Sequence, residues 1–138
     1  MTSEIIYKGA LRTAAKHLQS STVIETDAPV DNQGKGERFS PTDLMATSLG
    51  SCMLTIMGIK ARDMNIDLNG TEISIKKHMK QEPRRVGGID VEFRFPPALS
   101  IDEKEKVILE RAALTCPVAK SIHPDIEVNV DFGWNKKV

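Results

Sequence analysis

The sequence predicts an α+β fold. Three observations predict it: strand-like segments lie near both ends, one long apolar segment lies in the middle, and a second amphipathic helix separates the later strands. The chain has 138 residues, 40% of them hydrophobic, which fits one domain with one core. We therefore expect residues 1–138 to form a single domain.

The N-terminal part is expected to form antiparallel strands. Residues 4–16 and 21–26 carry β-branched side chains and alternate partially between apolar and polar residues. The stretch 27–38 is rich in Asp, Asn, Gly and Pro, which predicts an exposed loop. The N-terminal part should thus be a hairpin or meander followed by a loop.

A long central helix is expected from Ser40 to about residue 64. Ser40 suits the N-cap, and Pro41 needs no N–H at the first helical position. Asp43 completes a capping box and places negative charge at the positive end of the helix dipole. Hydroxyl side chains interrupt the apolar segment, which falls short of the roughly 20 apolar residues that span a bilayer. We expect a buried helix and no membrane partner.

This helix has a bulky face and a face of small side chains, and we expect both to be buried. A small face allows close approach of another helix, which in a chain this short can belong to a second subunit. Ordinary core packing, with methionines as gap-fillers, is the alternative. The bulky face holds Met45, Leu49, Met53, Ile56 and Met57, and the small face holds Thr47, Ser48, Ser51, Cys52, Thr55 and Gly58.

Later strands are expected over residues 66–80 and 88–95, joined by a charged turn, and over residues 126–134, which close the domain. A capping box beginning at Ser100 predicts a helix over residues 101–114 between them.

A short helical turn is expected after Thr115, which suits its N-cap. Cys116 and Pro117 would then occupy the first two helical positions.

Charge and composition exclude several classes of partner. Lys+Arg and Asp+Glu both number 19, so the chain has no general attraction to nucleic acid or to an acidic membrane. No secretory signal is visible at the N-terminus, and we expect a cytoplasmic protein. Two cysteines in a reducing compartment predict buried thiols, a metal site or a transient redox pair in preference to a static disulfide.

The three histidines, His17, His78 and His123, do not form a metal motif in the sequence. His123 lies seven residues after Cys116, but no close ligand pair such as CxxC or HxxxH is present. We expect neither a metal nor another cofactor.

Cys52 and Cys116 are the candidate reactive groups. The thiolate is the nucleophilic form, and an unassisted thiol is only a few per cent ionised at neutral pH. Cys116 lies at an expected helix start, where free N–H groups stabilise a thiolate. Cys52 lies well inside the central helix and needs a cation from elsewhere in the fold. Without one, Cys52 would be an inert core residue.

Three stretches of the sequence match a known family. They are GALRTAAKHLQS near the N-terminus, FSPTDLMATSLGSCM over residues 39–53 and TCPVAKSI over residues 115–122. These stretches resemble the OsmC/Ohr family of thiol-dependent hydroperoxide reductases, and the resemblance extends over residues 7–134. It implies an OsmC-like fold in an intertwined homodimer, with active sites at the subunit interface.

The resemblance also implies a reaction. Cys52 would attack an organic hydroperoxide and become a sulfenic acid, which Cys116 would convert to an intramolecular disulfide. An external dithiol would then reduce this disulfide. The family uses an arginine from the N-terminal strands, for which Arg12 is the best match and Arg38 the second.

One position departs from the family pattern. Ohr-type reductases commonly carry a glutamate ten positions before the reactive cysteine, where this chain has Thr42. Asp43 and Glu37 are candidates to hold the arginine in its place, although helix capping explains Asp43 equally well. With this departure, the chain resembles the divergent OsmC-like branches of the family more than the Ohr branch.

Phe39, Met45 and Leu49 are candidates to line a pocket for an alkyl chain, which would favour organic hydroperoxides over hydrogen peroxide. Core packing is the equal alternative. Two functions follow: a two-cysteine hydroperoxide reductase, or a non-catalytic stress-related protein that binds a small ligand on the same dimeric scaffold.

Overall fold

The computed structural model describes residues 1–134, which fall into two compact units. The first unit comprises Met1–Met45 and the second begins at Ala46. The boundary lies inside the long helix α1 (Pro41–Asp63), so this helix supplies the end of one unit and the start of the other. That residues 1–138 form a single domain stays a prediction.

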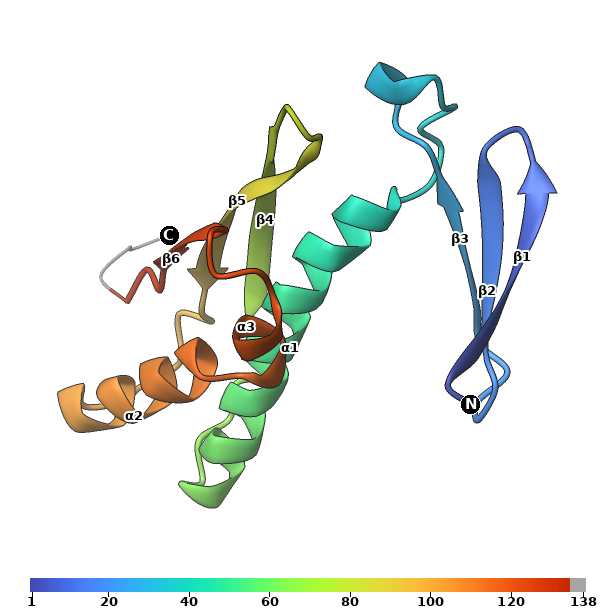
Figure 1. The fold of residues 1–138 in the computed structure, drawn as a ribbon. Coiled ribbons are helices and arrows are strands. Elements are labelled where there is room, and N and C mark those ends of the chain that lie inside the picture. Colours follow the sequence, from blue (N-terminus) through green and yellow to red (C-terminus); the bar gives the residue numbers. More distant parts are fainter. Residues whose placement is uncertain (135–138) are drawn as a thin grey trace. The chain divides into compact units, whose positions relative to one another are not determined.

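A three-stranded antiparallel meander forms most of the first unit (Figure 1). Its elements are β1 (Ser3–Gly9), β2 (Arg12–His17), β3 (Val23–Asp27) and the 3-10 turn η1 (Val30–Asn32). Between β1 and β2, Ala10 and Leu11 both have positive φ, as in the tight turns that match hairpin twist. The expected meander is confirmed, with Arg12 at the first position of β2.

Large hydrophobic side chains are exposed on both faces of this sheet. Ile5 and Ile6 are neighbours on β1 and therefore point to opposite faces, yet they are 69% and 66% exposed. Val23 and Ile24 show the same pattern on β3. A small sheet gains stability when a hydrophobic face is covered, so the described residues leave surface here that is suited to further packing.

The second unit combines a sheet with helices (Figure 1). β4 and β5 pair antiparallel, and β6 pairs with β5 in parallel, which gives the strand order β4-β5-β6. The hairpin, second helix, short helix and closing strand expected from the sequence are all present. After α1 the elements are β4 (Glu72–Lys80), β5 (Arg85–Arg94), α2 (Glu103–Leu114), α3 (Pro117–Ser121) and β6 (Glu127–Asp131).

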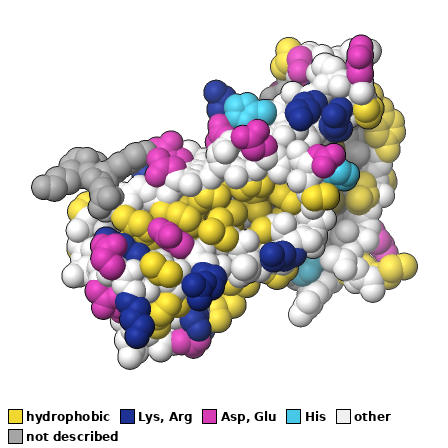
Figure 2. Space-filling view, turned by 60° about the vertical axis from the view of Figure 1, so that its left-hand side comes forward, with side chains coloured by type: hydrophobic (Ala, Val, Ile, Leu, Met, Phe, Trp, Pro, Cys, Tyr) yellow, Lys and Arg dark blue, Asp and Glu magenta, His cyan; other side chains and the backbone are white. Residues whose placement is uncertain are grey.

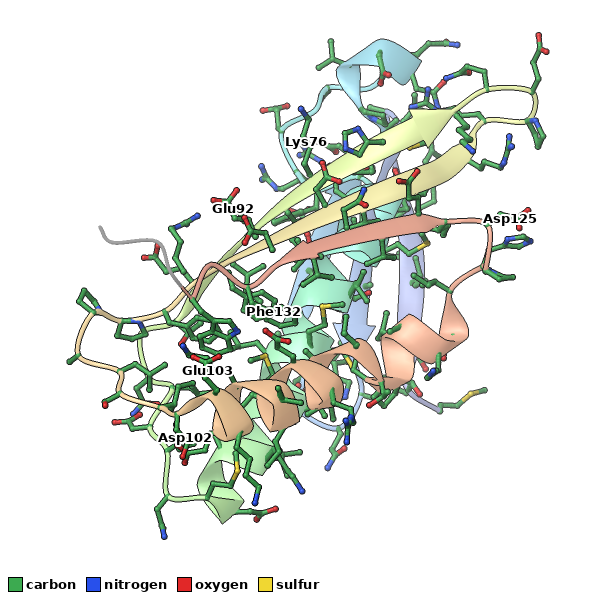
Figure 3. The ribbon with its side chains drawn as sticks, turned by 90° about the vertical axis from the view of Figure 1, so that its left-hand side faces the viewer. Lys76, Glu92, Asp102, Glu103, Asp125 and Phe132 are labelled. Carbon is green, nitrogen blue, oxygen red and sulfur yellow. The ribbon has the colours of Figure 1, made fainter. Side chains whose placement is uncertain are left out.

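This sheet has one apolar and one polar face. Ile75 lies opposite Val91, which lies opposite Val130, so an aliphatic row crosses all three strands. Figure 3 shows Lys76 and Glu92 on the polar side, away from α2. The alternation of the strands therefore directs their apolar side chains to the side of the sheet that the helix covers.

Helix α1 packs closely on the sheet at Gly50. A Cβ atom at this position would lie 2.7 Å from Cδ1 of Ile75 and 3.3 Å from Cγ2 of Ile73, so glycine permits the close approach. The buried positions recur at helical spacing and lie on one side of the helix. They are Ala46, Leu49, Gly50, Met53, Met57 and Ala61.

The small face of α1 is not buried as expected. Ser48, Ser51 and Thr55 are exposed in the chain, and Ile59 is 57% exposed. Exposed hydrophobic side chains also occur on α2, and Figure 2 shows hydrophobic side chains gathered into a band bordered by charged ones. One chain alone therefore leaves part of the small face uncovered, and its burial against a second subunit stays a prediction.

By length and composition alone, α1 is also apolar enough to cross a membrane. Core helices of globular proteins meet the same criterion. The close approach of Gly50 to the side chains of β4 is the packing expected of a core helix.

Two helix starts differ from the expected ones. The N-cap of α2 is Asp102, two residues after Ser100, and Asp102 and Glu105 form the reciprocal capping box. Cys116 is itself the N-cap of α3, whereas Thr115 is the C-cap of α2. The side chain that faces the free N–H groups of α3 is consequently the thiol.

Candidate functional site

Cys52 and Cys116 lie near each other within the second unit, close enough for Cys52 to raise the pKa of the Cys116 thiol. Cys52 is half-buried inside α1, and Cys116 has an exposed fraction of 0% at the junction of α2 and α3. Both cysteines are free, so two reduced thiols are neighbours here. The fold thus brings together two residues from distant parts of the sequence that chemistry alone singled out.

Burial dominates the environment of Cys116. Its removal from water raises the pKa of the Cys116 thiol, and the contact with Cys52 raises it further. The N–H of Ala119 donates to Sγ over 3.5 Å and acts in the opposite direction, but the net pKa shift is upward. The expectation that the helix start favours ionisation of Cys116 is therefore wrong in its net effect, because burial outweighs the N–H donor. Cys116 remains a protonated thiol at neutral pH.

In the first unit, Arg12 is held by Asp27. The two residues are directly opposite one another where β2 pairs with β3. Arg12 donates from Nε to Oδ1 of Asp27 over 2.7 Å and from Nη2 to Oδ2 over 2.8 Å. This bidentate ion pair raises the pKa of Arg12 and lowers the pKa of Asp27 from 3.8 to about 2. Both groups are therefore charged at neutral pH.

The other charged candidates lie near this pair in different roles. Glu37 Oε1 is 3.5 Å from Nη2 of Arg12, and its side chain is 58% exposed. Arg38 pairs with Glu25 over 3.2 Å and donates to the carbonyl of Glu37. Arg38 thus belongs to a neighbouring ion pair on the same sheet.

Asp43 caps the start of α1. Its Oδ2 accepts from the N–H of Ser40 over 2.9 Å, and Ser40 Oγ accepts from the N–H of Asp43 over 3.0 Å. The hydroxyl of Thr42 lies 3.2 Å from that of Ser40. Asp27 and Glu37 contact Arg12, and Asp43 fills the capping role that the sequence also allowed.

The three candidate pocket residues differ in exposure. Leu49 is fully buried, Met45 is partly buried and Phe39 is 56% exposed. The backbone carbonyl of Phe39 accepts from the N–H of Asp27 over 3.1 Å, so this residue also supports the Arg12 partner. Leu49 therefore packs in the core, as the alternative to a pocket residue predicts.

A cavity of about 660 Å³ lies elsewhere, in the second unit. Its aromatic wall contains Phe95 and Trp134, whose rings stack with centroids 4.1 Å apart. Lys106 Nζ lies 5.9 Å from the Trp134 ring centroid, and the Trp134 indole N–H donates to Glu110 over 2.6 Å. Residues lining the cavity include Phe93, Phe95, Pro96, Leu99, Lys106 and Trp134.

Asp27 is the site residue that the sequence analysis missed. It falls within the stretch expected to be an exposed loop, yet it ends β3 and is only 1% exposed. A meander with Arg12 at the start of its middle strand places the end of the third strand opposite that arginine. Which residue of the third strand lies there depends on the strand register, which the sequence does not specify.

Within residues 1–134, no three or more His, Cys, Asp or Glu side chains gather in a way that would hold a metal ion. His78 instead bonds Asp90 on the polar face of the sheet, with Nε2 and Oδ2 2.7 Å apart. His123 accepts from the N–H of Asp125 in the turn before β6.

Comparison with known proteins gives matches among family models and solved structures. The chain matches the family model described as OsmC-like protein over residues 34–131. It is also similar to the crystal structure of a Psychrobacter arcticus 273-4 protein named for osmotic stress induction and a detoxification response. The two are 59% identical with a TM-score of 0.90, over 94% of this chain and 93% of that chain. Among curated protein sequences, none matches.

Two more distant structures share the fold. An organic hydroperoxide resistance protein OsmC from Legionella pneumophila is 16% identical with a TM-score of 0.71, over 94% of this chain and 95% of that one. An organic hydroperoxide resistance protein from Vibrio cholerae, with captopril bound in one of its active sites, has the same identity and TM-score, over 94% and 90%. The α+β prediction is confirmed, and the chain belongs to the OsmC-like protein family.

Proposed function

We propose that this protein is a cysteine-based peroxidase that reduces organic hydroperoxides to alcohols through Cys52 and Cys116. The observation that carries the proposal is the proximity of these two free thiols. A pair of adjacent thiols is what a sulfenic acid intermediate requires for its conversion to a disulfide. Membership of the OsmC-like family supports the proposal, since relatives from Legionella and Vibrio are named organic hydroperoxide resistance proteins.

The reaction proceeds in three steps. The Cys52 thiolate attacks the terminal peroxide oxygen, the O–O bond breaks, and the departing alkoxide takes a proton to become the alcohol. Cys116 then attacks the sulfur of the Cys52 sulfenic acid, so that the S–S bond forms, the S–O bond breaks and water leaves with the thiol proton. An external dithiol exchanges with this disulfide and restores both thiols.

The environments of the two cysteines support these roles. Cys52 is half-buried, whereas Cys116 has no exposed surface for an approaching peroxide. The raised pKa of Cys116 keeps it protonated while Cys52 reacts. Cys116 is thus suited to the second attack, on the sulfur of the neighbouring Cys52.

Arg12 is the proposed partner of the peroxide. A higher thiolate fraction alone accelerates a thiol by roughly thirtyfold at most, since a few per cent is ionised beforehand. Fixed donors that stabilise the departing oxygen contribute roughly a hundredfold to a thousandfold more. An arginine is always charged and donates along two directions, which suits both purposes.

The proposed assembly is a homodimer in which Arg12 of one copy serves Cys52 of the other. The exposed hydrophobic side chains on both faces of the β1-β2-β3 sheet and the exposed small face of α1 support a second copy as the covering partner. The cytoplasm is the proposed location, because a reducing compartment supplies the dithiol that reopens the disulfide.

Titration of free thiols tests the proposed activity. Reduced protein is mixed with cumene hydroperoxide, and the remaining thiols are counted with a chromogenic disulfide reagent. The wild type should lose both thiols, and Cys52→Ser should lose none. Unchanged thiols in the wild type after excess peroxide would exclude the peroxidase.

Binding of a small apolar ligand without catalysis is the second candidate function. The cavity beside Phe95 and Trp134 favours it, because its volume of about 660 Å³ and aromatic wall fit a small molecule. An inert thiol pair together with quenching of Trp134 fluorescence by an apolar ligand would support this alternative.

A further inference from the structure

The position of the Arg12 guanidinium is determined by the strand register. Arg12 opens β2 and faces Asp27, the last residue of β3, across the ladder. A backbone hydrogen bond also joins the residues beside the pair: the N–H of Ala28, after Asp27, donates to the carbonyl of Leu11, before Arg12, over 3.1 Å. The backbones on both sides of the ion pair are therefore fixed to each other, which limits how far the two side chains can move apart.

The Asp27 carboxylate is itself held firmly. Besides its two bonds to Arg12, Oδ2 accepts the N–H of Glu37 over 3.0 Å, and the side chain is 1% exposed. Three N–H groups thus converge on one buried carboxylate, and they keep its pKa low. Asp27 remains an oriented anion throughout the neutral range.

This pairing leaves one side of the arginine available. Asp27 engages Nε and Nη2, and among the described residues Nη1 of Arg12 has no hydrogen-bond partner. The Arg12 side chain is 21% exposed. The ion pair therefore orients Nη1 as a donor while the other edge of the guanidinium is occupied.

Glu37 holds Arg12 far less strongly than Asp27 does. Its single contact with Nη2 is 3.5 Å long, and its side chain is 58% exposed. An exposed ion pair of this length contributes little. Substitution of Glu37 therefore serves as a comparison for substitution of Asp27.

We infer that Asp27 is the positioning residue for Arg12 and takes the place of the glutamate that the chain lacks at Thr42. This inference deepens the proposed peroxidase function and rests on it. Asp27 touches neither peroxide nor sulfur in this role; it directs Nη1 of Arg12 at the peroxide oxygen. Misplacement of a catalytic donor by about 1 Å can cost a hundredfold in rate, so loss of Asp27 should be visible in kinetics.

The rate of Cys52 oxidation by cumene hydroperoxide tests the inference. We expect Asp27→Asn to lower the second-order rate constant by about tenfold or more, Asp27→Glu to recover part of it, and Glu37→Gln to change it less than about threefold. Glu25→Gln is the matched control, because Glu25 lies on the same strand and pairs with Arg38. Its rate constant should equal that of the wild type.

A double-mutant cycle separates positioning from a merely structural role. If Asp27 acts through Arg12, then Asp27→Asn should cause no further loss in an Arg12→Ala background. An unchanged rate in Asp27→Asn, or equal losses in both backgrounds, would overturn the inference. If Asp27→Asn does not fold, the same cycle with Asp27→Glu decides.

A readout independent of activity keeps the inference separate from the proposed function. The Nε–H resonance of Arg12 in ¹⁵N NMR spectra should exchange slowly with water in the wild type and in Glu37→Gln, and rapidly in Asp27→Asn. Suppose that peroxide does not oxidise the wild-type thiols but the Arg12 resonance shows these exchange rates. The proposed peroxidase function would then be contradicted, and Asp27 would still be the anchor of Arg12. Slow exchange that persists in Asp27→Asn would refute the anchoring itself.

Discussion

The fully buried Cys116 lies beside the half-buried Cys52, which raises the pKa of its thiol. Cys52 thus keeps some solvent-exposed surface, and Cys116 keeps none. This asymmetry supports an order in the proposed chemistry, in which the less buried cysteine reacts first.

Replacement of Cys116 should arrest the reaction after its first step. In Cys116→Ser, cumene hydroperoxide should oxidise Cys52 to a sulfenic acid that dimedone traps, and excess peroxide should carry it to the sulfinic acid. Mass spectrometry measures both products. The wild type should give the disulfide and little dimedone adduct. A Cys116→Ser variant that does not react at all would reverse the two assignments.

Mixing two inactive variants should restore activity if the site is shared between subunits. Arg12→Ala and Cys52→Ser are unfolded together and refolded as a mixture. A mixed dimer would contain one site with both intact residues and one with neither. Peroxide consumption well above that of either variant alone is the expected result. No recovery, with mixed dimers demonstrated by mass spectrometry, would place Arg12 and the cysteine it serves in the same chain.

The Arg12–Asp27 pair should make stability depend on pH in acid. The pKa of Asp27 falls from 3.8 to about 2 on folding, so its stabilising effect is complete above the unfolded value and is lost as the pH falls through the folded one. The difference in urea midpoint between the wild type and Asp27→Asn should therefore be constant from about pH 7 to pH 5 and shrink below about pH 4. A difference that stays constant down to about pH 2.5 would contradict the shift.

The contact between Gly50 and Ile75 should appear as coupling between two substitutions. Gly50→Ala should destabilise by about 1–3 kcal/mol, because the new methyl group meets Cδ1 of Ile75. Ile75→Val removes that atom and should cost about 1 kcal/mol alone. The double variant should lose less than the sum of the two, as measured by urea unfolding. Strict additivity would show that α1 and β4 are not this close.

The sequence was sufficient wherever structure depends on neighbouring residues. The start of α1 follows from Ser40 and Asp43, whose reciprocal bonds are local to one turn. The alternation of β4 likewise determines which side chains face the helices. The two cysteines could be chosen from their chemistry, although only the fold shows that they lie near each other.

What escaped prediction depends on distant residues. Asp27 was missed because the register between β2 and β3 determines its partner, and composition carries no register. The direction of the Cys116 pKa shift was missed because a helix start is visible in sequence whereas burial is not. The start of α2 differs for a local reason: Ser100 and Asp102 both suit an N-cap, and the reciprocal capping box forms between Asp102 and Glu105.

The proximity of Cys52 on α1 to Cys116 at the start of α3 also affects the free energy of unfolding. A disulfide between Cys52 and Cys116 would close a covalent loop that contains β4, β5 and α2. Restriction of the unfolded chain by a loop of this size is worth roughly 4 kcal/mol. The oxidised protein would then resist unfolding better than the reduced one, so each catalytic cycle would alternate between a cross-linked, more stable protein and a looser one ready to react.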